Sequence, residues 1–312
     1  MIIRTAQESD KPAIIQLLKK SLGESLLKKS QTVWDFKHVA NPFGSSPVWL
    51  AEEHNQLIGV RAFMAWHWQT GSKVWQAYRA VDTATHPDYQ GKGIFRTLTL
   101  KALEAVAQKG SCFIFNTPNE KSRPGYLKMG WKVIDRLSLA VVPVPFVFFW
   151  GLFARRQDNR TAVPDEVLQR LCEHHNSVLA QTNKLFTPKS AAYLNWRYAQ
   201  NPMQDYKVFA DENSYLALYC KKHNYFTELR VAEVIYTSER ELRALRKRIV
   251  QQALVNKCLI ITVANKKMFT LQWYGKFGPA LTFHPNTSAA ALEQHAMQLN
   301  NWSYSLGDLE LF

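Results

Sequence analysis

Cysteine is scarce in this sequence. The chain of 312 residues has four cysteines, Cys112, Cys172, Cys220 and Cys258, and no two of them are spaced as Cys-x-x-Cys. A structural zinc site needs clustered ligands, so no metal is expected. Scattered cysteines in a chain of this size are typical of proteins kept in a reducing cytoplasm. We therefore expect a cytoplasmic protein that folds without a disulfide or metal staple.

Acidic residues are also few. The chain has 25 Asp and Glu against 39 Lys and Arg, a net charge of +14. This charge favours a polyanionic partner, which includes nucleic acid, anionic lipid and phosphorylated small molecules. Some of the basic residues cluster, as in the run RALRKR at residues 243–248. Because basic runs on helices mostly form solvated faces, direct nucleic-acid binding is not favoured.

Several familiar signatures are missing. The first residues, MIIRTAQESDKPAI, lack the basic start and apolar run of a signal peptide. Neither the P-loop pattern GxxxxGKS/T nor the dinucleotide pattern GxGxxG occurs. The hydrophobic fraction is 46% and the charged fraction 21%, which are ordinary values for a globular protein. The length suggests two domains.

One long stretch carries no charge. Residues Leu137–Ala154, LSLAVVPVPFVFFWGLFA, are followed by two arginines. The run reaches the lower limit for a membrane span, but Pro143 and Pro145 interrupt it. We favour a buried strand that leads into a linker. The alternative is a segment that lies in a membrane interface, since aromatic residues before a basic pair are typical of such segments. This alternative would give peripheral membrane contact through residues 141–156.

Hydrophobic periodicity predicts helices and strands in mixed order, which indicates an α+β protein with mixed α/β layers. A first helix is expected from Ser9 or Asp10 onward. The further expected strands are Val48–Glu52, Leu57–Trp68, Gln76–Thr85, Cys112–Asn116, Tyr215–Cys220, Leu229–Thr237 and Cys258–Ala264. The further expected helices are Gly93–Lys109, Arg240–Asn256 and an apolar one near Lys267–Tyr274.

The two halves of the chain contain an internal repeat. Aligning Asn41-Pro42 with Asn201-Pro202 gives an offset of 160 residues and places Lys37 opposite Arg197. An aromatic residue before this base, Asn-Pro after it and a following strand all stay in register. The pattern indicates a structural duplication. The alternative is two aromatic-rich helix ends that are each stopped by proline.

The segment Val81–Arg96, VDTATHPDYQGKGIFR, points to a phosphate-bearing ligand. It predicts a strand, a proline turn and a Gly-Lys-Gly loop that opens a helix. Free N–H groups at a helix N-terminus bind anions. Gly91 and Gly93 let a diphosphate approach the main chain, and Lys92 and Arg96 add positive charge.

This segment resembles the acetyl-CoA loop of the GNAT N-acetyltransferases. Thr85, Pro87, Gln90 and Gly93 take the first four places of the family pattern, and Phe95 stands where the family has Gly or Ala. A second family motif follows in NEKSRPGYLKMGW, where Asn119 precedes Tyr126 by seven residues and Gly130-Trp131 closes a short helix. Pro124-Gly125 within that helix departs from the usual pattern.

The resemblance implies a GNAT fold and a set of site residues. The backbone of residues 83–85 would pair with the pantetheine arm, the glycine loop would hold the pyrophosphate, and Tyr126 would protonate the departing CoA thiolate. The implied cofactor-binding residues are Thr83, Ala84, Thr85, Gln90, Gly91, Lys92, Gly93, Ile94, Phe95, Arg96, Asn119 and Ser122. Asp82, on the strand beside the cofactor, is a candidate base or acceptor anchor, and His86 in the proline turn is a less favoured candidate base. Water relays are the alternative to a dedicated base.

The second half lacks the cofactor signature. In place of the glycine loop it has YTSERELRALRKR, where Glu239 and Glu241 would repel a diphosphate. We therefore expect two tandem GNAT-like domains, each with a central mixed sheet flanked by helices. The first is a cofactor-binding domain at residues 1–140, followed by an apolar linker at 141–159 and a degenerate domain at 160–312.

The implied function is an acetyl-CoA-dependent N-acyltransferase that acts on a primary amine, with a small amine or an amino sugar as the favoured acceptor. The alternatives are a non-catalytic CoA-binding module and a basic protein that binds nucleic acid or a membrane surface. The sequence leaves the acceptor, the acyl chain length and the oligomeric state open.

Overall fold

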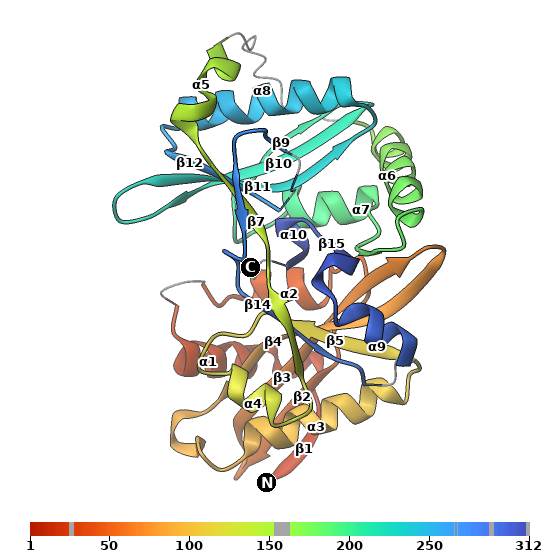
Figure 1. Ribbon diagram of the computed structural model, residues 1–312. Coiled ribbons are helices and arrows are strands. Elements are labelled where there is room, and N and C mark those ends of the chain that lie inside the picture. The colour runs from red at the N-terminus through yellow and green to blue at the C-terminus, as the bar shows by residue number, and fades with distance from the viewer. Residues whose placement is uncertain (25–27, 153–162, 265, 267, 287–289, 310–312) are drawn as a thin grey trace. The chain divides into compact units, whose positions relative to one another are not determined.

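The chain folds into two compact units of mixed sheet and helix (Figure 1). The computed structural model describes residues 1–24, 28–152, 163–264, 266, 268–286 and 290–309. Unit 1 comprises residues 1–135 and 280–301, and unit 2 comprises residues 136–279 and 302–311. Neither unit is therefore one continuous stretch of chain.

The sheet of unit 1 has the strand order β1-β2-β3-β4-β5-β14-β6. The pairs from β1 to β4 are antiparallel, β4 and β5 are parallel, and β5 and β14 are antiparallel. The strands are β1 (Ile2–Thr5), β2 (Val48–Glu53), β3 (Gln56–Thr70), β4 (Lys73–Thr85), β5 (Cys112–Asn116), β6 (Lys132–Arg136) and β14 (Ala280–His284). The α-helices are α1 (Lys11–Leu22), α2 (Gln31–His38), α3 (Ile94–Ala107), α4 (Arg123–Leu127) and α9 (Ala290–Ala296).

Helices cover both faces of this sheet because side chains alternate along each strand. Val60 and Ala62 of β3 pack with the buried face of α1, while Phe63 and Ala65 pack with α3. The turn between β2 and β3 forms at His54 and Asn55, whose φ angles of 51° and 61° suit a tight hairpin. Asp10 does not cap α1 with its side chain but binds Arg4.

The sheet of unit 2 has the strand order β13-β7-β12-β11-β10-β9. Its strands are β7 (Leu139–Pro143), β9 (Lys207–Ala210), β10 (Ser214–Lys222), β11 (Thr227–Tyr236), β12 (Ile260–Val263) and β13 (Trp273–Gly275). Two short strands outside this sheet, β8 (Leu185–Phe186) and β15 (Trp302–Ser303), pair in parallel with each other. Its helices are α5 (Val144–Leu152), α6 (Asp165–Ala180), α7 (Ala191–Leu194), a π-helical turn at Asn195–Ala199, α8 (Glu239–Val255) and α10 (Leu306–Leu309).

The two halves of the chain exchange one strand each. β7 follows the strands of unit 1 in sequence but pairs with β12 and β13 in unit 2. β14 follows the strands of unit 2 but pairs with β5 in unit 1. In Figure 1 the blue β14 accordingly joins a sheet of red to yellow strands. Part of the segment expected as a linker, residues 141–159, is thus a sheet strand and the helix α5, while residues 153–162 lie outside the described part.

The repeat found in the sequence has the same local structure in both units. Ser30 caps α2 by accepting a hydrogen bond from the Val33 amide, and Ser190 caps α7 in the same way with Tyr193. The side-chain oxygen of Asn41 accepts from the Phe43 amide, and that of Asn201 accepts from the Met203 amide. Matching caps and turns at one offset support a structural duplication.

Two apolar segments fold differently from what the sequence predicts. The apolar helix expected near Lys267–Tyr274 is wrong for the described residues, because Met268–Gln272 is not helical and Trp273 begins β13. Met268 and Phe269 are instead buried in the core of unit 2, where tertiary packing overrides the local pattern. The run Leu137–Ala154 forms β7 and α5, and none of the helices in the described ranges has the length and apolar character to cross a membrane.

Candidate functional site

Strands β4 and β5 part before β4 ends. Their parallel pairing runs from Gln76 opposite Cys112 to Arg79 opposite Phe115. β4 then continues for six residues, Ala80–Thr85, and keeps its pairing with β3 on the other side. In the part of the chain described here, this leaves the β5-facing edge of β4 available to an extended ligand, which could add main-chain hydrogen bonds as a strand does.

A β-bulge shapes this end of β4. Val60 pairs with Ala84 and Ala62 pairs with Val81, so Arg61 of β3 faces two residues, Asp82 and Thr83. Asp82 has a φ of 44°, a backbone conformation that a non-glycine residue adopts only when its surroundings hold it. The bulge therefore bends β4 at the point where it leaves β5.

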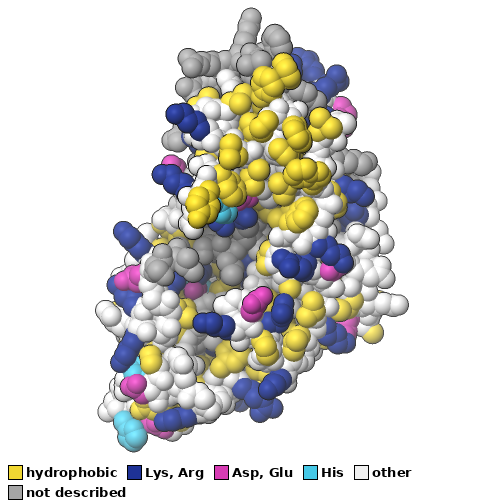
Figure 2. Space-filling view, turned by 60° about the vertical axis from the view of Figure 1, so that its left-hand side comes forward, with side chains coloured by type: hydrophobic (Ala, Val, Ile, Leu, Met, Phe, Trp, Pro, Cys, Tyr) yellow, Lys and Arg dark blue, Asp and Glu magenta, His cyan; other side chains and the backbone are white. Residues whose placement is uncertain are grey.

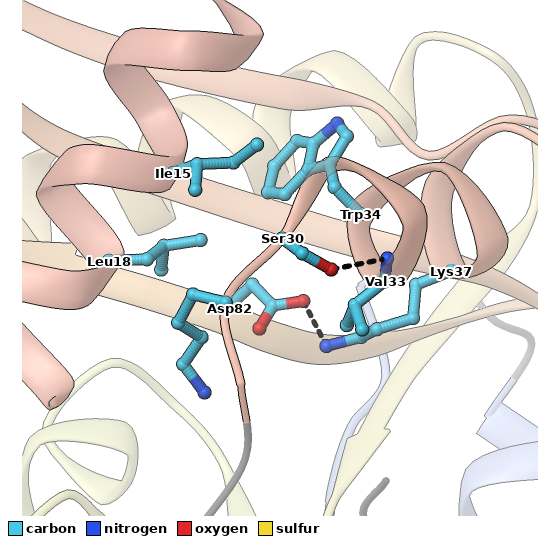
Figure 3. A pocket seen from close by; sticks show the side chains of 8 residues that line it. Ile15, Leu18, Ser30, Val33, Trp34, Lys37 and Asp82 are labelled. Atoms are coloured by element: carbon cyan, nitrogen blue, oxygen red, sulfur yellow. Dashed lines mark hydrogen bonds and ion pairs between the residues drawn. The ribbon is translucent and has the colours of Figure 1, made fainter. Parts of the chain in front are cut away.

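Two side chains of α2 hold Asp82. Its carboxylate forms an ion pair with the Lys37 ammonium and lies 2.8 Å from His38 Nε2. Figure 3 shows the Asp82 carboxylate directed toward the end of Lys37, in a small hollow that Ile15 and Leu18 of α1 also line. Burial by itself would raise the pKa of Asp82, but Lys37 and His38 outweigh it and hold the pKa well below its usual range. A lowered pKa favours the charged form of Asp82 near neutral pH, and its role as base or acceptor anchor stays a prediction.

Unit 2 contains a matching arrangement. β11 has a bulge at Ala232, since Ala217 pairs with Glu233 and Leu218 pairs with Val231. Glu233 accepts a hydrogen bond of 3.0 Å from the Tyr198 hydroxyl, and Tyr198 is the counterpart of His38 at the offset of 160. In both units, a side chain of the preceding helix thus binds the carboxylate beside the bulge. Unit 2 has this contact although it lacks the glycine loop. This recurrence indicates an architectural role for Asp82.

The glycine loop leads directly into α3. Gly91 and Gly93 have φ angles of 79° and 78°, which L-residues rarely adopt. No heavy atom lies within 4 Å of where a Cβ would be at either glycine, so the surface above the loop is open. Gly93 is the N-cap of α3 and provides no side-chain cap. The free N–H groups of the first turn therefore face open space and can bind an anion.

The start of α3 sits close to the sheet. A Cβ at Gly59 of β3 would lie 2.6 Å from Ile94 Cγ2 and 3.0 Å from Leu98 Cδ1, so only glycine allows this approach. The Ile94 side chain is buried there, which leaves its backbone amide as the group that could face a ligand. Gln90, Lys92 and Arg96 are exposed around the loop, and the Lys92 ammonium lies 4.5 Å from the centre of the Tyr89 ring.

Phe95 fills the space that Gly125 leaves. A Cβ at Gly125 would lie 2.9 Å from Phe95 Cε1, and the Phe95 ring meets the Tyr126 ring edge to face at 5.4 Å. The two departures from the family pattern, a bulky residue at 95 and a glycine within α4, therefore compensate each other. Phe95 connects the first turn of α3 to the helix that carries Tyr126.

Asn119 and Ser122 organise the start of α4. Asn119 Oδ1 accepts a hydrogen bond of 2.8 Å from the Ser122 amide. The Ser122 carbonyl then accepts from the Tyr126 amide at 3.2 Å. These two residues thus set the position of Tyr126, and contact with a cofactor remains a prediction for both.

Tyr126 is buried and hydrogen-bonded to Arg61. Arg61 Nη1 donates to the Tyr126 hydroxyl at 2.8 Å and also to the Thr83 hydroxyl. Arg61 is fully buried, and its Nε and Nη2 atoms have no hydrogen-bond partner among the described residues. The rings of Phe63, Phe95 and Tyr126 lie 4.8 to 5.7 Å from the guanidinium carbon and stabilise its charge.

The corresponding helix of unit 2 has no anion site. Ser238 caps α8 by accepting a hydrogen bond from the Glu241 amide, and Glu239 and Glu241 lie in the first turn. These carboxylates satisfy the helix dipole and repel phosphate. The two helix starts thus differ at Gly93 and Ser238, and the absence of CoA binding by the second half stays a prediction.

The structure brings together most of the predicted residues. The loop 90–96, the end of β4 and Tyr126 surround one region of unit 1, with Phe95 and Arg61 as direct links. Ala84 packs its side chain into the core beside α1, so only its backbone can contribute. The sequence analysis did not identify Lys37 and His38 as partners of Asp82, although both residues lie within the internal repeat.

Comparisons with known proteins agree with this geometry. Residues 2–134 match the family model described as an acetyltransferase (GNAT) domain. A GCN5-related N-acetyltransferase from Anabaena variabilis ATCC 29413 superposes with a TM-score of 0.65 at 12% identity, over 94% of this chain and 75% of that one. The corresponding protein from Kribbella flavida also gives 0.65, at 14% identity over 90% and 70%.

A third structure extends the same likeness. Eis1 from Mycobacterium abscessus gives a TM-score of 0.62 at 14% identity, over 96% of this chain and 76% of its own. A search of curated proteins finds no match. At such low identity the solved structures show the fold alone, and they confirm the predicted arrangement of mixed sheets flanked by helices over most of the chain.

Proposed function

Because residues 2–134 match the family model of a GNAT acetyltransferase domain, we propose that the chain transfers an acetyl group from acetyl-CoA to a primary amine. The observation that carries this proposal is the split between β4 and β5 beside the uncapped start of α3. The pantetheine arm and the diphosphate of acetyl-CoA would both bind to one stretch of chain, Ala80–Arg96.

The structure of unit 1 fits acetyl-CoA as a substrate. The open edge of β4 would pair with the pantetheine arm through the backbone of residues 83–85. The amides of the loop Gly91–Arg96, together with Lys92 and Arg96, would bind the pyrophosphate. Backbone amides, glycine conformations and exposed cations are the groups that a diphosphate needs, and all are present in this loop.

Acetyl-CoA supplies a thioester, whose carbonyl carbon the amine nitrogen attacks. A carbon–nitrogen bond forms, the carbon–sulfur bond breaks, and the nitrogen loses one proton. We assign to Tyr126 the proton that the sulfur gains. Arg61 can only donate hydrogen bonds, so its bond to the phenol oxygen leaves the Tyr126 O–H free to point away from it, as a general acid requires.

The proton lost by the amine needs no side-chain base. Asp82 is committed to Lys37 and His38, and its lowered pKa makes it a weak acceptor. We propose that water accepts this proton and that Asp82 positions the bulge of β4. A small amine or an amino sugar is the acceptor that we favour. Unit 2 binds no CoA in this proposal.

The decisive experiment is a calorimetric titration of the full chain with acetyl-CoA. We expect one site per chain. Gly93→Asp should abolish binding, because its carboxylate would stand at the anion site. Gly71→Asp is the matched control, since Gly71 also has a positive φ of 57° and open space around it but lies in the β3–β4 turn.

Three results would contradict parts of this proposal. Two sites per chain would mean that unit 2 also binds CoA. Unchanged affinity in Gly93→Asp would refute the loop assignment. Tight binding without acetyl transfer to any amine in a broad panel would favour the non-catalytic CoA-binding module.

A further inference from the structure

Unit 2 presents an exposed aromatic face. It consists of Phe146 and Phe149 of α5, Leu271, Trp273 and Tyr274 at β13, and Phe277, and we call this set the aromatic face. Between 42% and 63% of each of these residues is exposed. Figure 2 shows yellow side chains gathered over one region of the surface, with Lys and Arg mainly around its margins. Large apolar patches on a surface mark interaction sites.

The fold holds this face in place. α5 buries Val144 and Val147 in the core of unit 2 together with residues of α8, which turns Phe146 and Phe149 outward. β13 is fixed by its pairing with β7. The Phe146 ring meets the Trp273 ring edge to face at 6.5 Å, so the two elements form one continuous surface.

The described segments that form the aromatic face carry charge of a single sign. Residues 136–152, 257–264, 266 and 268–279 contain four basic residues, Arg136, Lys257, Lys266 and Lys276, and no Asp or Glu. Lys257, Lys266 and Lys276 are exposed. An anionic partner is therefore favoured over an ordinary protein surface of mixed charge.

We propose that the aromatic face docks unit 2 onto an anionic lipid surface. Trp, Tyr and Phe insert at the boundary between headgroups and acyl chains, and lysines around them attract acidic headgroups. The short helix α5 and β13 would lie along the interface. This inference rests on unit 2 alone and does not depend on the acetyltransferase proposal.

Vesicle sedimentation of the full chain tests this inference. The probes are vesicles of phosphatidylcholine alone and of phosphatidylcholine mixed with phosphatidylserine. We expect binding to the mixed vesicles to be at least about tenfold stronger and to weaken with salt. Equal binding to both vesicles, or none, would overturn the proposal.

Two variants locate the contact. Phe146→Ser combined with Phe149→Ser should weaken binding to the mixed vesicles at least about tenfold, since each exposed ring loses its burial in lipid. The matched control is Tyr225→Ser, which removes an aromatic residue of unit 2 that is 94% exposed between β10 and β11. This control should bind as the parent does, and an equal loss in both variants would refute the location.

Misfolding and self-association are distinguished in the same samples. Thermal unfolding should show the same midpoint for the parent and the paired Phe variant, because Phe146 and Phe149 are exposed. Analytical ultracentrifugation should show the same mass for both. If the parent is a dimer that the paired variant converts to monomer, and neither sediments with vesicles, the aromatic face is a self-interface and the lipid proposal is wrong.

Discussion

At the scale of single residues, Arg61 and Tyr126 form the most consequential pair. A buried guanidinium without a carboxylate partner is costly, and three aromatic rings and two hydroxyl groups offset that cost here. Because Arg61 cannot accept a hydrogen bond, it fixes the phenol oxygen as acceptor on one side. Arg61 is thus a positioning residue for the proposed acid.

The coupling between these two residues can be measured. Tyr126→Phe should lower kcat by roughly 10²-fold with little change in KM for acetyl-CoA, as expected for a lost general acid. Arg61→Met should also lower kcat, because the Tyr126 O–H loses its fixed direction. In the Tyr126→Phe background, Arg61→Met should have almost no further effect. Release of free CoA thiol, followed with an accepted amine, gives these rates.

Arg79→Met is the control for this cycle. Arg79 is also fully buried, on β4, and donates a hydrogen bond of 3.5 Å to the Thr117 hydroxyl. Its effect on kcat should therefore add to that of Tyr126→Phe. Additive behaviour of Arg61→Met as well would show that Arg61 supports the fold and does not position Tyr126.

Phe95 and Gly125 form a second complementary pair. Gly125→Ala should lower the free energy of unfolding by about 1–3 kcal/mol, because the new methyl group meets the Phe95 ring at 2.9 Å. In the Phe95→Ala background, Gly125→Ala should cost less or stabilise, since the ring is gone. Denaturant unfolding of the four proteins measures this coupling. Equal costs in both backgrounds would mean that the two residues are not coupled.

At the scale of elements, α2 determines the shape of β4. Lys37 and His38 hold Asp82 in a left-handed conformation, and this keeps the bulge at the point where β4 leaves β5. Unit 2 has an equivalent contact, between Tyr198 and Glu233, although it lacks the glycine loop. The bent strand and the ligand loop are therefore separable features.

This contact makes stability depend on pH. The pKa of Asp82 is lowered, so its contribution is complete above about pH 4 and is lost as the pH falls further. Burial lowers the pKa of His38 as well, so the unfolded chain takes up a proton below about pH 6.5 that the folded chain does not, and stability falls there too.

Asp82→Asn tests the lower of these two pH ranges. At pH 7 it should cost about 3–5 kcal/mol, because Lys37 keeps its buried charge without a partner. The difference from the parent should shrink as the pH falls below about 4, because the unfolded parent takes up a proton at residue 82 there and the folded parent does not. Asp88→Asn, at an exposed carboxylate, should change stability by less than about 0.5 kcal/mol. A difference that stays constant with pH would contradict the ion pair.

At the scale of the whole molecule, the exchange of β7 and β14 links the two units through the chain. The sheet of unit 1 needs residues 280–284 to cover β5, and the sheet of unit 2 needs residues 139–143 beside β12. A fragment that ends near residue 140 therefore lacks a central strand, although residues 2–134 match the family model. Its exposed strand β5 would be free to pair with other chains.

Fragments test this dependence directly. We expect residues 1–140 alone to aggregate or to unfold at a much lower temperature than the full chain. Joining residues 1–138 through a Gly/Ser linker to residues 279–301 should restore cooperative unfolding and acetyl-CoA binding. The same linker followed by a scrambled 279–301 segment is the control. A stable, CoA-binding fragment 1–140 would show that β14 is dispensable.

Local sequence determined much of this molecule. Periodicity placed α1, α3, β5 and the strands around them, and the cap and turn residues fixed the repeat, because these features depend on neighbours within a few positions. The glycine loop and its helix could also be predicted from the sequence, since Gly91 and Gly93 have the conformations that the backbone requires there.

Tertiary structure alone decided the rest. Which sheet accepts β7 or β14 depends on pairing between residues more than a hundred positions apart. The partners of Asp82 come from α2, and the partner of Tyr126 comes from β3, so no local pattern could assign them. The periodicity of residues 267–274 wrongly predicted a helix. The apolar residues Met268 and Phe269 pack into the core of unit 2 without being helical, and a local pattern does not contain that information. Local sequence thus determined where most helices and strands form, and long-range packing determined which strands pair and which side chains meet.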